Sequence, residues 1–183
     1  MTRTALESVD AVFRAALDRW AERPMMETLS SVAEIYDIDA GTISYGDAGA
    51  YVGALAQKLV CAGYGTGMRI GLLLENRPIF FLHWLAFNRI GVSVCPFNPD
   101  LRAAELEYQI GHAEPALIVA IAPRIAELQA ATDAAGIKLQ VIAPGNGIPA
   151  PRENAIVTPD AEDVADHEAA ILYTSGTTGQ PKG

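Results

Sequence analysis

The segment RIGLLLENRPIFFLHWLAFNRIGVSVC, residues 69–95, decides how this chain folds. It contains a short apolar run, a longer apolar stretch opened by Pro78, and a second short run rich in β-branched residues. This order is typical of a strand–helix–strand unit with parallel strands. We therefore predict strands over residues 69–74 and 92–95, joined by a helix over residues 79–90.

The same alternation continues on the C-terminal side. Helices are predicted over residues 102–112 and 123–135, and strands over residues 116–121, 138–142 and 169–173. Residues 144–160 hold four prolines and two glycines and are expected to form an internal surface loop. Strands that alternate with helices indicate the α/β class, with largely parallel sheets covered by helices.

The N-terminal side has a different pattern. Residues 5–20 have apolar side chains at helical spacing, and Pro24 ends that region. A strand over residues 28–37 and a return strand over residues 42–45 predict an N-terminal hairpin. Ser44 and Asp47 then form a capping box, which opens a helix extending to about Ala62.

Composition narrows the classes of function. Half of the 183 residues are hydrophobic and 19% are charged, which suits about one domain with a sizeable core. The net charge of −9 excludes a broad grip on nucleic acid. No signal peptide and no apolar run long enough to span a bilayer is recognised. Cys61 and Cys95 lie in apolar sequence. We therefore expect both to be reduced thiols in the core of a cytoplasmic protein, and neither to belong to a metal site.

The most informative segment is YTSGTTGQPKG, residues 173–183. Hydroxyl side chains and glycines occupy six consecutive positions in it, Thr174, Ser175, Gly176, Thr177, Thr178 and Gly179. The glycines permit positive φ, so that successive N–H groups can converge on one point. Lys182 adds a compact positive charge. Because ligands of open α/β sheets bind beyond the carboxyl ends of strands, the segment predicts a phosphate-binding loop.

Two other interpretations of this segment fit less well. A P-loop requires G-x-x-x-x-G-K-[ST], whereas Lys182 follows Pro181 and Gly183 stands where a hydroxyl is needed. A flexible Gly/Thr-rich linker rarely follows an apolar strand and rarely contains Pro-Lys-Gly.

The segment resembles the signature loop of the adenylate-forming superfamily, which includes acyl- and aryl-CoA synthetases, peptide-synthetase adenylation domains and luciferases. The resemblance extends to TISYGD at residues 42–47, ENRP at residues 75–78 and GVSVCPFNP at residues 91–99, so it covers nearly the whole chain. The departures from the family pattern lie outside the loop, at Met68, Asn88 and Arg89.

The resemblance implies ATP-dependent activation of a small carboxylate to an acyl-adenylate, followed by thioester formation with coenzyme A. The expected cofactors are ATP, Mg²⁺ and coenzyme A. Of these, Mg²⁺ and coenzyme A are implied by the family resemblance alone. The six loop residues named above and Lys182 would line the triphosphate, positioning it and neutralising charge without transferring protons. No catalytic residue and no metal ligand is expected within this chain.

The family's adenine-, ribose- and metal-binding motifs and its catalytic lysine are expected after Gly183. Residues 1–183 are therefore expected to be the N-terminal part of an AMP-binding domain, whose truncated sheet favours self-association. Two alternatives stay open. One is an adenylation domain of a peptide synthetase, and the other is a non-catalytic nucleotide-binding or interaction module.

The remaining candidates favour structural roles. His83 lies in an apolar helix and is expected to be a core histidine. The aromatic side chains of the same helix are expected in the core rather than in an acyl pocket, at Phe80, Phe81, Trp84 and Phe87. His112 and Glu114 resemble a deaminase motif only superficially, because no P-C-x-x-C follows.

We predict that residues 1–183 alone do not form an acyl-adenylate, because the expected catalytic lysine and metal ligand lie beyond Gly183. The measurement is ATP–pyrophosphate exchange with a panel of carboxylates. Turnover by this chain would contradict the prediction.

Overall fold

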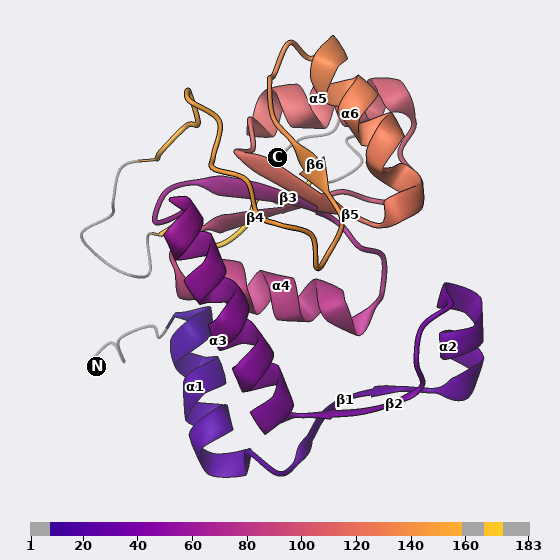
Figure 1. Cartoon of the computed structure of the whole chain (residues 1–183), viewed down its shortest axis with the longest axis vertical. Helices are drawn as coiled ribbons and strands as arrows, with labels where there is room; N and C mark the ends of the chain where they lie inside the picture. Colours follow the sequence, from indigo (N-terminus) through magenta and orange to yellow (C-terminus); the bar gives the residue numbers. More distant parts are fainter. Residues whose placement is uncertain (1–7, 159–166, 174–183) are drawn as a thin grey trace, which may run out of the picture.

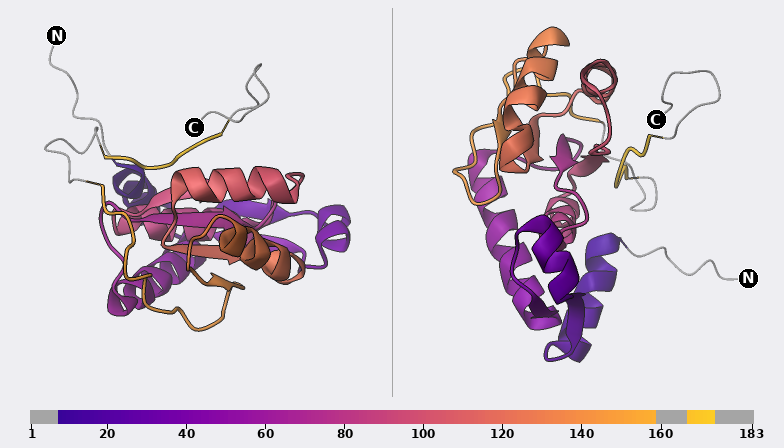
Figure 2. Two further views of the ribbon diagram at one scale, coloured as in Figure 1. Left: turned by 90° about the horizontal axis from the view of Figure 1, so that it is seen from above. Right: turned by 90° about the vertical axis from the view of Figure 1, so that its right-hand side faces the viewer.

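Four parallel strands form the centre of the fold, in the order β4-β3-β5-β6 (Figure 1). The computed structural model describes residues 8–158 and 167–173. The strands are β3 (Arg69–Leu73), β4 (Ser93–Pro96), β5 (Leu117–Ala120) and β6 (Val141–Ile142). Helices cover both faces of this sheet, which confirms the predicted α/β class (Figure 2).

Side chains that alternate along the strands divide the core between the two faces. Leu72 and Val119 pack with helices α3 (Tyr45–Ala62) and α4 (Pro78–Arg89) on one face. Leu73 and Ile118 pack with helices α5 (Ala103–Ala113) and α6 (Ile125–Ala134) on the other face, with the 3₁₀ turn η1 (Ala122–Arg124) leading into α6. Because β3 and β5 are buried on both faces, their sequences are continuously apolar rather than alternating.

Gly71, in β3, allows a close approach that sets the spacing of one layer. A Cβ at this position would lie 2.5 Å from Phe97 Cε2 and 2.9 Å from Ile118 Cγ1. Phe97 is 4% exposed and fills the space above the glycine. The chain segment after β4 can therefore cross directly over the centre of the sheet.

Helix α1 (Val9–Trp20) packs on α3 and α4 and adds a third layer of helices. Phe13 supplies its buried contact. Asp10 is 9% exposed, and its carboxylate accepts a hydrogen bond from Arg89 Nε at 2.8 Å. Arg14, one turn along α1, pairs with the same carboxylate at 3.0 Å. Arg89 therefore ties α1 to the end of α4.

The N-terminal hairpin is real, but its first strand was misplaced in the sequence prediction. Strands β1 (Pro24–Thr28) and β2 (Gly41–Ser44) pair antiparallel, and residues predicted as strand form helix α2 (Ser30–Tyr36) instead. Asp37 ends α2 in a left-handed conformation, with its N–H donating to the Ala33 carbonyl. Propensity misled here, because β-branched residues stand beside Ala33 and Glu34, which favour helices. The hairpin and α2 project sideways from the sheet (Figure 1).

Other predicted elements differ at their boundaries or in kind. The Ser44–Asp47 capping box is present and opens α3, which ends at Ala62 as predicted. The strand predicted over residues 138–142 shortens to Val141–Ile142. In place of a strand over residues 169–173, a single parallel bridge joins Ala170 to Val94. The described part of the predicted surface loop, residues 144–158, contains no helix or strand.

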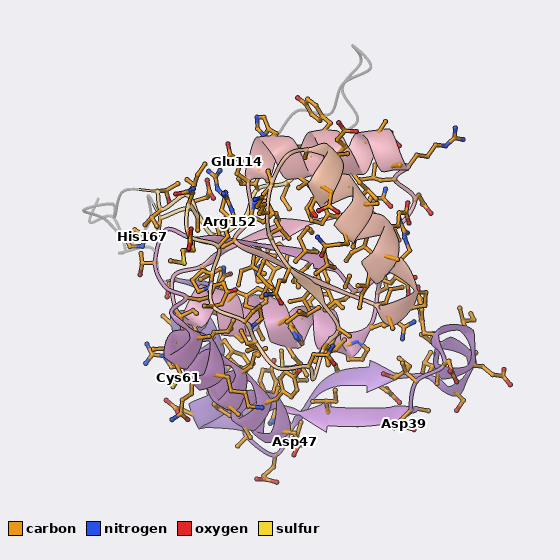
Figure 3. All side chains as sticks on the ribbon, turned by 45° about the horizontal axis from the view of Figure 1, so that its top comes forward. Asp39, Asp47, Cys61, Glu114, Arg152 and His167 are labelled. Atoms are coloured by element: carbon orange, nitrogen blue, oxygen red, sulfur yellow. The ribbon has the colours of Figure 1, made fainter. Side chains whose placement is uncertain are left out.

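The two cysteines differ in exposure. Cys95 is buried in β4, as predicted, whereas Cys61 is exposed on the outer surface of α3 (Figure 3). The prediction that Cys61 lies in the core was wrong. Its apolar neighbour Val60 is exposed as well, so an apolar stretch of sequence does not by itself show which side of a helix is buried.

We predict that Gly71→Ala lowers the free energy of unfolding by about 1–3 kcal/mol, because the added methyl overpacks the Phe97 contact. Urea denaturation measures the change. Gly65→Ala is the matched control, since a Cβ there meets nothing within 4 Å. Equal effects of the two substitutions would contradict the assigned close packing.

Candidate functional site

The candidate phosphate-binding residues, 174–179 and Lys182, lie outside the described residues. The structure does describe residues 167–173, which lead directly into them. The contacts of this lead-in segment show what holds it in place.

The lead-in segment lies beside β4, on the side of that strand away from β3. The Val94 amide donates to the Ala169 carbonyl at 3.1 Å, and the Ile171 amide donates to the Val94 carbonyl at 2.9 Å. The bridge is parallel, so the chain at Ala170 runs in the same direction as β3, β4 and β5. It therefore heads for the edge at which open α/β sheets bind their ligands.

Asn88, near the end of α4, makes a third attachment to the lead-in segment. Its Nδ2 donates to the Ala169 carbonyl at 2.9 Å and to the Val92 carbonyl at 3.1 Å. Its Oδ1 accepts a hydrogen bond from Trp84 Nε1 at 2.8 Å, which fixes the orientation of the amide. One side chain thus connects α4, the start of β4 and the lead-in segment.

A charged pair holds the other end of the lead-in segment. Arg69 donates from Nε and Nη2 to the two carboxylate oxygens of Glu168, both at 2.8 Å. Arg69 Nη1 also donates to the Ala113 carbonyl at 3.2 Å. Hydrogen bonding to Glu168 raises the pKa of Arg69. Burial is the largest single influence on the pKa of Glu168 and raises it, but hydrogen bonds from Arg69 and Ser93 together with the positive charge of Arg69 outweigh burial and hold that pKa below its ordinary value.

Tyr173, the last described residue before the loop, contacts α5. Its hydroxyl and His112 Nδ1 share a hydrogen bond of 2.7 Å, and the two rings meet edge to face. Burial raises the pKa of Tyr173 to about 12, so the phenol stays protonated at neutral pH. Burial likewise raises the pKa of the Cys95 thiol to about 12, which makes that thiol a poor nucleophile.

The carboxyl ends of the strands border two hollows. One, of about 630 Å³, is lined by residues that follow β3 and β4, among them Glu75, Asn76 and Asn98. The other, of about 820 Å³, lies between the hairpin and the ends of β3 and β5 and is largely apolar. Both volumes fall in the range of small-molecule sites, as expected at this edge of the sheet.

The structural roles predicted for the α4 side chains hold in part. His83 is 3% exposed, and its Nδ1 donates to the Ile79 carbonyl at 2.9 Å, which confirms a core histidine. Burial lowers its pKa. Phe87 is buried, but Phe81 is 54% exposed and lines the smaller hollow, so its core prediction was wrong. An apolar helix pattern cannot identify which member of a cluster lies at the rim.

No group of three or more metal-ligating side chains occurs within residues 8–158 and 167–173. Among the same residues, no helix is long and apolar enough to cross a membrane. The described residues supply the attachments of the lead-in segment and the two hollows, while the candidate phosphate-binding residues stay a prediction from sequence.

The parallel sheet, covered by helices and extended beside β4 by the lead-in segment, defines an α/β protein. The family described as AMP-binding enzyme matches residues 13–183. The chain therefore belongs to the AMP-binding enzyme family, as the loop motif predicted.

Curated relatives include both CoA ligases and peptide synthetases. The sulfoacetate–CoA ligase of Cupriavidus necator is 26% identical over 97% of this chain and 34% of that protein. The 2-succinylbenzoate–CoA ligase of Bacillus licheniformis is 33% identical over 70% of this chain and 25% of that protein. Tyrocidine synthase 2 of Brevibacillus parabrevis is 29% identical, with 5% of that protein covered. The chain thus spans about a third or less of these relatives.

Solved structures show the same fold. VinN matches 98% of this chain and 43% of its own, at 23% identity and a TM-score of 0.72. ATP-bound MatB from Rhodopseudomonas palustris matches 95% of this chain and 34% of its own, at 27% identity and a TM-score of 0.65. The predicted α/β architecture is therefore that of AMP-forming ligases.

We predict that Glu168→Gln lowers the free energy of unfolding by about 1 kcal/mol at pH 7, a value kept small because the pair is partly exposed. The folded-state pKa of Glu168 is depressed, so its stabilisation is complete above the ordinary value of 4.5 and is lost as the pH falls below it. Urea denaturation at pH 7 and near pH 3 should show the difference from wild type shrinking.

Glu107→Gln is the control for this prediction, because Glu107 is an exposed carboxyl of α5 without an ion-pair partner among the described residues. It should leave stability nearly unchanged at both pH values. A wild-type advantage over Glu168→Gln that grows on acidification would refute the role given to this pair.

Proposed function

We propose that the chain acts in ATP-dependent activation of a small carboxylate to an acyl-adenylate, followed by thioester formation with coenzyme A. The observation that carries this proposal is YTSGTTGQPKG, residues 173–183, which follows a segment that runs parallel to β4. Membership of the AMP-binding enzyme family and the two CoA ligase relatives support it. We likewise propose residues 1–183 as the N-terminal part of the AMP-binding domain, with residues 144–160 as its internal surface loop.

The donor set of the loop fits a triphosphate. Four hydroxyls, at Thr174, Ser175, Thr177 and Thr178, and the backbone amides around two glycines supply neutral donors, and Lys182 supplies one cation. The MatB structure with ATP supports the same class of ligand, as a property of that relative. Residues 173–183 hold no carboxylate, so Mg²⁺ would have to be held by the phosphates and by ligands outside this segment.

In this proposal the loop works by position and charge. Its hydroxyls and N–H groups hold the terminal phosphates, so that the α-phosphate faces the incoming carboxylate. Lys182 offsets charge on the pyrophosphate as the bond to the α-phosphate breaks. The attacking carboxylate oxygen forms the new bond to phosphorus, and pyrophosphate leaves with the bonding electrons. No residue of the loop needs to accept a proton.

A second candidate keeps adenylation but changes the acceptor thiol. Tyrocidine synthase 2 and the isonitrile lipopeptide synthase of Mycobacterium tuberculosis are 29% and 27% identical to this chain. The acceptor would then be the thiol of a carrier protein instead of coenzyme A. Supplying each acceptor to a preformed acyl-adenylate distinguishes the two candidates.

We predict that Lys182→Ala lowers the adenylation rate of the full-length enzyme by about one hundredfold, because a cation that stabilises the transition state is lost. Thioester formation from supplied acyl-adenylate should change much less. ATP–pyrophosphate exchange measures the first half-reaction. The amount of thioester formed from supplied acyl-adenylate measures the second.

Lys138→Ala is the control, since Lys138 is an exposed lysine remote in sequence from the loop. It should leave both half-reactions unchanged. An equal loss in both half-reactions of Lys182→Ala would overturn the role assigned to this ammonium group.

A further inference from the structure

The lead-in segment lies at one edge of the parallel sheet and β6 at the other, and each is hydrogen-bonded to an amide side chain of a neighbouring helix. On one side, Asn88 of α4 bonds to the carbonyl of Ala169 in the lead-in segment, residues 167–173. On the other side, Gln129 of α6 donates to the Leu139 carbonyl at 3.1 Å and accepts from the Val141 amide at 3.3 Å. The two amides make the same kind of attachment, but only one of them holds the segment that enters the loop.

The lead-in segment needs such an attachment, because its own pairing is short. Among the described residues, two backbone hydrogen bonds join it to β4, and both are made by Val94. With so few backbone bonds, the register of the segment depends on side chains. Arg69 holds Glu168 and His112 contacts Tyr173 through flexible side chains of the segment, whereas Asn88 bonds to its backbone. A slip of one residue would move the chain by about 3.3 Å and turn each side chain to the opposite face.

The Asn88 amide opposes a slip at a specific atom. The Ala169 carbonyl accepts from both the Val94 amide and Asn88 Nδ2, at 3.1 Å and 2.9 Å, so both lone pairs of that oxygen are used. Trp84 holds the acceptor end of Asn88, which leaves its Nδ2 directed at carbonyls. Ala169 stands in the lead-in segment, five positions before Thr174, the first residue of the proposed loop.

We propose that Asn88 is a positioning residue for nucleotide binding, because it fixes the register of the lead-in segment and thereby the point at which the phosphate loop begins. This inference rests on the proposed function of the loop. Asn88 itself touches no substrate and acts through Ala169. If the register could shift, the hydrogen-bond donors of the proposed loop would no longer be aligned with the phosphates.

The experiment compares Asn88→Leu with Gln129→Leu in the full-length enzyme that contains residues 1–183. Both substitutions replace an amide by an apolar group of similar size and remove an attachment of one outer strand. Urea denaturation should give similar losses of stability for the two variants. Titration calorimetry with Mg·ATP should show binding weakened about tenfold by Asn88→Leu and less than about twofold by Gln129→Leu.

Asn88→Asp provides a second variant in case the leucine variant does not fold. It keeps the acceptor for Trp84 and removes the two donors, so it should weaken Mg·ATP binding at least as much as Asn88→Leu. Wild-type affinity in either Asn88 variant, or equal weakening by Gln129→Leu, would overturn the proposal.

Hydrogen exchange separates this inference from the proposed function. Asn88→Leu should speed amide exchange within residues 167–173, whereas Gln129→Leu should speed exchange near Val141 instead. If the wild-type full-length enzyme does not bind Mg·ATP, the proposed function fails, and the exchange result still decides whether Asn88 fixes the register. Unchanged protection of residues 167–173 in Asn88→Leu would refute the inference by itself.

Discussion

The double pairing of β3 is the constraint on which the rest of the structure depends. Its backbone is hydrogen-bonded to β4 on one side and to β5 on the other, and both of its faces are covered by helices. Such a strand is apolar along its length, and it needs a small side chain where another part of the chain packs closely over it. Gly71 meets the last condition, and the crossing of Phe97 above it directs the chain into α5. The common carboxyl edge of the strands is a consequence of this parallel arrangement.

Sequence predicted most of this arrangement, because strand–helix alternation is a local signal with a strong period. It failed at α2, where β-branched residues outweighed the helix formers beside them. It also failed over residues 169–173, where an apolar run promised a strand but only Ala170 pairs with β4. Pairing depends on what a partner strand offers, and no local pattern encodes that.

The candidate site divides in a similar way. The loop stays a prediction from sequence, which was possible because its hydroxyls and glycines are consecutive and Lys182 follows three positions after Gly179. Its attachments could not be predicted, because Arg69 and Glu168 are separated by 99 positions and Asn88 and Ala169 by 81. In the sequence, Asn88 differs from the family pattern as a polar residue in a predicted apolar helix. The structure supplies the reason for that polarity, which is a carbonyl far along the chain.

The contrast between the two cysteines has a practical consequence. Cys61 is exposed on α3, whereas Cys95 is buried and its pKa is raised to about 12. Thiolates add to the double bond of maleimide reagents, so at neutral pH these reagents discriminate strongly between the exposed and the buried sulfur atom. A fluorophore or spin label could thus be attached at one defined place without engineering, on a helix that lies across the sheet from α5 and its contact with Tyr173.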